Sequence, residues 1–181
     1  MKKAKSFLFL VLLFWLACAL AFPQSLTVAK KGEWGTGNYL HVFVKGNYAY
    51  CAASGAGLDI IDISSPSKPL KVGTCDTPGD AEGVYVSGSF AYVADEYGGL
   101  QIIDISNPAS PNLTGSYDTY AHSWSVSVSG SYAYLADGEG GLLIFDVANP
   151  ASPALAGSYD TSGTAYGGSL SGSYAYLADG E

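Results

Sequence analysis

Carboxylates in two glycine-rich segments are the first residues of this sequence that could do chemistry. The segments read DEYGG at 95–99 and DGEGG at 137–141. Hard cations such as calcium bind carboxylate oxygens held on loops, so we expect a candidate calcium site at these acids. The residues concerned are Asp95, Glu96, Asp137 and Glu139. A solvated acidic turn, in which aspartate accepts hydrogen bonds from nearby amides, is the simpler interpretation of the same pattern.

A second set of candidates lies in three segments that each begin with Asp-Thr. They read DTPGDAEG (76–83), DTYAHSWS (118–125) and DTSGTAYG (160–167), and after their first two residues they differ from one another. Variable loops on a rigid scaffold are the usual place for binding residues. We therefore expect ligand binding at Asp80, Glu82, His122, Trp124 and Tyr166. The alternative is that Trp124 and Tyr166 only fill a central channel.

Catalytic signatures are missing from the sequence. It contains neither G-x-S-x-G nor G-x-x-x-x-G-K, and its two histidines are His41 and His122. So few His and Cys residues make a tetrahedral zinc site improbable. We expect a protein that is not an enzyme and needs no cofactor, calcium excepted. The alternative is an enzyme acting on extracellular glycans, with Asp80, Glu82 and His122 as its acids and bases.

The charge of the chain excludes one class of partner. The 181 residues have a formal net charge of -8, with eight Lys and no Arg. After Lys71 the chain carries 13 acidic side chains and no further Lys or Arg. A nucleic-acid binder neutralises phosphates with Lys or Arg, so nucleic acid is not expected as a partner.

The N-terminal residues have the pattern of an export signal. Three lysines within residues 1–5 precede an apolar run of 16 residues, 7–22, and Ala19-Leu20-Ala21 offers a cleavage site. We expect a signal peptide at 1–21 and a mature chain that begins at Phe22. The run is shorter than the roughly 20 residues that span a bilayer, so no membrane span is expected in the mature chain. Lipid attachment at Cys18 is the alternative to free secretion.

The rest of the chain repeats every 42 residues. Four segments superpose without a gap: VKGNYAYCA (44–52), VSGSFAYVA (86–94), VSGSYAYLA (128–136) and LSGSYAYLA (170–178). Residues 84–125 and 126–167 are identical at 25 of 42 positions. Internal repetition at this period is typical of repeat architectures.

Each repeat predicts four short strands. In the second repeat these are 84–87, 90–94, 100–105 and 113–117, with a tight turn at Gly88 and a proline-containing break at 107–111. Four strands in about 40 residues form one blade of a β-propeller. We expect an all-β propeller of four-stranded antiparallel blades, with repeats starting near 42, 84, 126 and 168.

The expected propeller is incomplete. The partial propeller occupies 38–181, after a leading segment, 22–37, that carries an N-terminal strand at 26–34. Three full blades and half of a fourth, about 3.5 in all, fall short of the usual 4–8. We therefore expect an open arc, and a chain that is a fragment of a longer protein.

The repeat motif points to a family. The patterns SGSYAYLAD, GGL-x-I-x-D and NPASP resemble the LVIVD repeat, over residues 38 to 181. The resemblance implies a propeller in an exported or surface protein, with a binding or scaffold role and no shared catalytic residues. The expected partner is an unknown surface protein or glycan, and the location is the cell surface, the periplasm or the medium. A calcium-stabilised surface structural protein is the alternative.

Two cysteines remain in the repeats. Cys51 aligns with strand residues Val93 and Leu135, and Cys75 aligns with Tyr117 and Tyr159. The second and fourth strands of a blade lie about 9.6 Å apart, beyond the reach of a disulfide of about 7 Å between Cα atoms. We expect two free, largely buried thiols.

Overall fold

Two-residue turns at 42-residue intervals form the first hairpin of each blade. Gly46, Gly88, Gly130 and Gly172 have φ between +56° and +59°, a region that glycine adopts without steric cost. Each is the first residue of a two-residue loop between paired strands, where a type II′ turn requires glycine. The turn predicted at Gly88 is confirmed.

The computed structural model describes Glu33 and residues 37–180, within one compact unit, 31–181. The predicted signal peptide at 1–21 and Cys18 lie outside the described residues. So does the leading segment with its strand at 26–34, apart from Glu33 and Gly37.

Three four-stranded antiparallel sheets and one hairpin follow one another along the chain. The first blade contains β1 (His41–Lys45), β2 (Tyr48–Ala52), β3 (Leu58–Asp62) and β4 (Leu70–Cys75). The second contains β5 (Gly83–Ser87), β6 (Phe90–Ala94), β7 (Leu100–Asp104) and β8 (Asn112–Tyr117). The third contains β9 (Ser125–Ser129), β10 (Tyr132–Ala136), β11 (Leu142–Asp146) and β12 (Ala154–Tyr159). The last two strands are β13 (Thr164–Ser171) and β14 (Tyr174–Gly180).

The aspartate that ends the third strand of each blade fixes the turn that follows. Asp62, Asp104 and Asp146 each accept a hydrogen bond from the backbone amide two residues later, at 2.8–2.9 Å. This is the Asx-turn geometry, which holds the chain as it enters the proline-containing connection. Hydrogen bonds from the hydroxyl and the amide of Ser64 lower the pKa of Asp62, and those from the amide and the hydroxyl of Ser106 lower the pKa of Asp104.

The core lies between neighbouring blades. Apolar side chains of β2 and β3, among them Leu58 and Ile60, pack against Val84 and Val93 of the second blade. Leu100 and other residues of the second blade pack in the same way against the third. A fully buried side chain of this kind contributes about 1.5–3 kcal/mol, so the stacking of successive blades carries most of the stabilisation.

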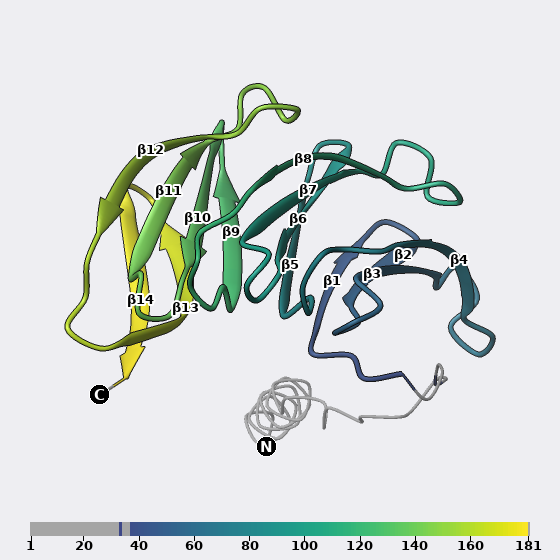
Figure 1. The fold of residues 1–181 in the computed structure, drawn as a ribbon. Coiled ribbons are helices and arrows are strands. Elements are labelled where there is room, and N and C mark those ends of the chain that lie inside the picture. The colour runs from purple at the N-terminus through teal and green to yellow at the C-terminus, as the bar shows by residue number, and fades with distance from the viewer. Residues whose placement is uncertain (1–32, 34–36, 181) are drawn as a thin grey trace, which may run out of the picture. The chain divides into compact units, whose positions relative to one another are not determined.

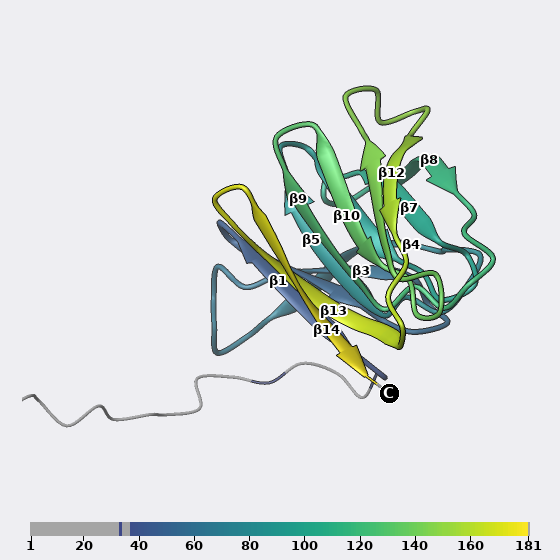
Figure 2. The same ribbon diagram turned by 90° about the vertical axis from the view of Figure 1, so that its left-hand side faces the viewer.

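The blades form an open, incomplete propeller, as predicted. Strand β5 contacts both β1 and β9, and β9 contacts β13, so the first strands of successive blades lie side by side (Figure 2). The sheets follow one another around an arc that does not close into a ring (Figure 1). None of the described residues belongs to a helix with the length and hydrophobicity that a bilayer crossing needs.

Candidate functional site

The loop between the second and third strands of each blade pairs with the connection that leads to the next blade. Isolated β-bridges join Ser54 to Ala81 and Glu96 to Ser123, and a third joins the corresponding loop and connection one repeat later. Ser54 and Glu96 have positive φ, of 47° and 44°, which turns each loop toward its bridge partner. The two kinds of segment therefore lie on one face of the arc, the loop face.

Two of the four candidate calcium ligands face inward. Asp95 is fully buried, and it accepts hydrogen bonds from the Thr77 hydroxyl at 2.5 Å and from the Gly79 amide at 2.8 Å. Asp137 is equally buried and accepts bonds from Thr119 at 2.7 Å and from Ser123. Each carboxylate thus holds the connection that leaves the preceding blade.

Burial dominates the electrostatics of these two aspartates. Desolvation raises the pKa of Asp95 and of Asp137. The hydroxyl groups that donate to the two carboxylates oppose part of this increase. Glu96 and Glu139 do not join them: among the described residues, no three His, Cys, Asp or Glu side chains are grouped to hold a metal ion. The geometry favours the structural role, and the calcium site stays a prediction.

The aromatic candidates form a row of ring contacts on the loop face, one stacked and two tilted, which we call the aromatic stack. The rings of His122 and Trp124 lie parallel, 3.9 Å apart with 7° between their planes. Tyr166 follows at 5.6 Å from Trp124, and Tyr97 lies 5.2 Å from the other side of His122. The stack therefore runs in the order Tyr97, His122, Trp124, Tyr166. Its two ends are the accessible ones, since Tyr97 is 64% exposed and Tyr166 52% exposed.

Carboxylates surround this stack. Glu96 Oε1 lies 3.5 Å from His122 Nε2, and Asp80 accepts a bond from the Ser54 hydroxyl at 3.3 Å. Partial burial raises the pKa of Glu82; His122 opposes this shift, whereas Glu96 and Asp80 add to it. The site thus holds several acids close enough to repel one another, which favours a positively charged occupant.

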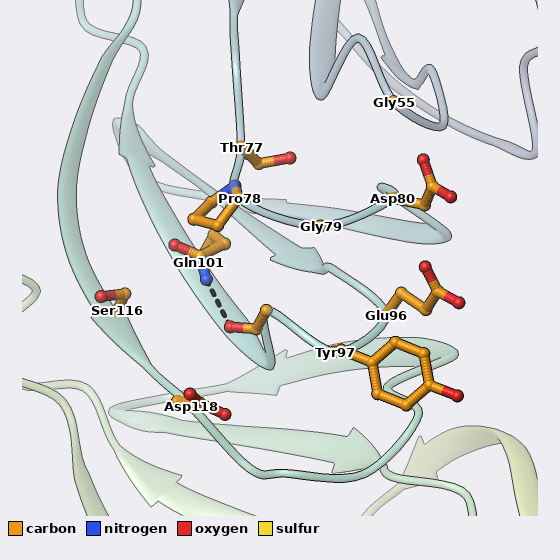
Figure 3. Close-up of a pocket in the computed structure, with 11 residues that line it drawn as sticks. Gly55, Thr77, Pro78, Gly79, Asp80, Glu96, Tyr97, Gln101, Ser116 and Asp118 are labelled. Carbon is orange, nitrogen blue, oxygen red and sulfur yellow. Dashed lines mark hydrogen bonds between the residues drawn. The ribbon is translucent and has the colours of Figure 1, made fainter.

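Two hollows on the loop face share Tyr97. The larger, of about 700 Å³, is lined by the connections at both ends of the second blade and by the loop that carries Glu96 and Tyr97 (Figure 3). The smaller, of about 280 Å³, is lined by Tyr97, His122 and Trp124 of the aromatic stack and by Tyr120 and Glu139. We call the two together the junction groove, because loops from consecutive blades build it.

Comparison with known proteins identifies the repeats. The family model of the LVIVD repeat matches residues 36–77, 78–119, 121–161 and 162–181. The chain belongs to the LVIVD repeat family. The four matched LVIVD repeats coincide with the three complete blades and the final hairpin.

Solved structures resemble the LVIVD repeat chain in fold alone. The computationally designed protein Ika4 superposes with a TM-score of 0.68 at 8% identity, over 81% of this chain and 88% of Ika4. The designed protein Ika8 gives 0.62 at 8% identity, over 76% of this chain and 42% of Ika8. Comparison with curated protein sequences found no match.

Tyr97 and Gln101 line the junction groove but were not among the sequence-based candidates. Tyr97 shares its position in the LVIVD repeat with Gly55 and Glu139, and its exposed ring begins the aromatic stack. Gln101 shares its position with Asp59 and Leu143, and it is 1% exposed in the wall of the larger hollow. A polar residue within the apolar third strand was the available signal for Gln101. For Tyr97, the signal was an aromatic residue inside an acidic loop.

Proposed function

We propose that this LVIVD repeat protein is an exported, cell-surface module that binds a surface protein or glycan through its loop face. The observation that carries the proposal is the convergence of the predicted residues: His122, Trp124 and Tyr166 form one stack, with Asp80 and Glu82 beside it. A row of aromatic rings edged by carboxylates suits ligand binding, because rings offer apolar surface and carboxylates accept hydrogen bonds.

Export is the second part of the proposal, and it rests on the N-terminal sequence. The mature protein is expected outside the cytoplasm with Phe22 at its N-terminus. Mass spectrometry of the exported material tests this: an intact Met1 in a cytoplasmic fraction contradicts export, and a lipid on Cys18 makes the protein a lipoprotein.

Binding is tested on the exported protein with a panel of defined neutral, acidic and amino glycans and of neutral, acidic and basic peptides. Trp124→Ala is expected to weaken whichever binding is found by about tenfold. Ser131→Ala, in the hairpin turn on the opposite face, is the matched control and keeps full affinity. Absence of binding across the panel, or binding that Trp124→Ala leaves unchanged, contradicts the assignment of the loop face.

A further inference from the structure

The junction groove is acidic along its whole length. Lys71 is the last Lys or Arg of the chain, and apart from Gly55 the residues that line the groove follow it in the sequence. Four acidic residues line it: Asp80, Glu96, Asp118 and Glu139. Charges of one sign gathered in a hollow attract a ligand of the opposite sign and repel anions.

Three side chains of the groove share a direction. Asp80, Glu96 and Tyr97 come from two different segments, and their side chains project toward the same side of the larger hollow (Figure 3). A positively charged group placed there meets two carboxylates and the exposed face of a tyrosine ring. Carboxylates and aromatic faces both attract ammonium and guanidinium groups.

Polar atoms without a protein partner lie in both parts of the groove. In the larger hollow Gln101 donates through Nε2 to the Gly98 carbonyl, while its Oε1 is buried without a donor among the described residues. In the smaller hollow Trp124 Nε1 is buried without an acceptor in the same part of the chain. The walls of the groove thus hold one buried acceptor and one buried donor without a protein partner, whereas most buried polar groups have one.

These observations discriminate between ligand classes. The described acids do not group as a metal site does. A neutral sugar gains little from four carboxylates, and an anion is repelled. A peptide segment with Lys or Arg side chains supplies cations for the carboxylates and for the exposed Tyr97 ring. The positive charges of such a peptide are spaced along its length, and the acids of the groove are spaced along the groove.

We propose that the junction groove binds a basic, extended segment of a protein partner, with one cationic side chain seated among Asp80, Glu96 and Tyr97. This inference rests on the proposed function and narrows its ligand to a lysine- or arginine-rich peptide. The seat lies at one end of the aromatic stack, and the bound chain runs along the stack toward Tyr166. The attraction weakens with added salt, because screening acts on partly exposed charges.

The test measures binding by tryptophan fluorescence in the full chain with Trp15→Phe and Trp34→Phe, which leaves Trp124 as its one indole. The probes are an oligolysine peptide, the same peptide with glutamine in place of lysine, a chitosan oligomer and a neutral glucan oligomer. Oligolysine is expected to change the Trp124 emission and to bind at least tenfold more tightly than its glutamine version. That preference should fall as salt is raised.

Variants then locate the seat. Glu96→Gln and Asp80→Asn are each expected to weaken oligolysine binding by roughly threefold to tenfold, and Tyr97→Ala by a similar factor. Asp146→Asn removes the same charge on the opposite face and keeps the oxygen that accepts from Ala148, so it should leave binding unchanged. Equal melting temperatures show that each variant is folded.

The outcomes separate the two proposals. Binding of the glucan or chitosan oligomer without oligolysine overturns the peptide assignment but leaves the loop face as a binding surface. Oligolysine binding that Glu96→Gln, Asp80→Asn and Tyr97→Ala do not weaken also overturns it. If no probe in this set or in the wider panel binds, both proposals fail.

Discussion

The hydroxyl of Thr77, in the connection that leaves the first blade, donates to the buried carboxylate of Asp95 in the second blade at 2.5 Å. Thr119 makes the same bond to Asp137 one repeat later, at 2.7 Å. The first repeat has Ala53 at the position of these aspartates. The bond therefore links consecutive blades rather than strands of one blade.

Replacement of Thr77 by valine should destabilise the fold. A hydrogen bond to a buried charged group contributes about 1.5–3 kcal/mol, so the free energy of unfolding is expected to fall by that amount. Thr161 occupies the same repeat position, but its Oγ1 has no partner among the described residues. Thr161→Val is thus the matched control, expected to change stability by less than about 0.5 kcal/mol. Denaturant unfolding measures both, and equal losses would refute the role of the Thr77 bond.

An ion pair between a buried carboxylate and a partly exposed lysine in the first blade gives a second prediction. Asp59 is 2% exposed and accepts bonds from Lys71 Nζ at 2.8 Å, from the Thr74 hydroxyl at 2.7 Å and from the Tyr39 hydroxyl at 3.0 Å. Lys71→Leu leaves this carboxylate without its cation, and because the Lys71 side chain is 39% exposed the cost should be about 1 kcal/mol.

The third blade supplies the control for this pair, because it has Leu143 and Leu155 at the two positions. Asp59→Leu combined with Lys71→Leu should recover part of the lost stability, because an apolar pair replaces both charges while the Tyr39 and Thr74 hydroxyls lose the Asp59 acceptor. A double-mutant cycle measured by thermal or denaturant unfolding isolates the coupling. A double variant no more stable than Lys71→Leu alone would argue against it.

The raised pKa values of Asp95 and Asp137 predict a pH dependence of stability. A carboxyl whose pKa is higher in the folded state stabilises the fold fully below the ordinary Asp pKa of about 3.9, and that contribution is lost as pH rises through the folded value. The melting temperature should therefore be higher at about pH 4.5 than at about pH 7. Asp95→Asn with Asp137→Asn should reduce this difference, and an unchanged difference would contradict the assignment.

The thiols are free, as predicted, but they are not equally buried. Cys51 is buried in β2, where desolvation raises its pKa to about 11, while Cys75 in β4 is partly exposed, with its pKa also raised by desolvation. Cys51 should not react with a thiol reagent in the folded protein and should react once denaturant is added, without reductant.

Cys51→Val provides the check on this prediction. It copies Val93 of the second blade, should cost less than about 1.5 kcal/mol, and should remove one thiol from the denatured count. Reaction of Cys51 in the folded state would contradict its burial.

The sequence was sufficient for the fold because 42-residue recurrence repeats every local signal. The turn at Gly88 and the predicted strands of the second repeat all lie within one or two residues of their expected places. Three members of the loop-face stack, His122, Trp124 and Tyr166, were predicted as binding residues, but Tyr97 and the arrangement of the rings were not. Repetition could not foresee that Tyr97 of one loop would lie beside His122 of the next connection, since that contact depends on the packing of consecutive blades. Export and the fragment status of the chain stay predictions.

The bridges join each loop to the connection that follows it. The candidate binding residues therefore lie at the junctions between blades and not within a single blade. A duplication of one 42-residue repeat adds a junction without disturbing the apolar interfaces, since each blade needs only a neighbour of the same kind. Changes in the few residues after Asp-Thr are then enough to diversify the new junction.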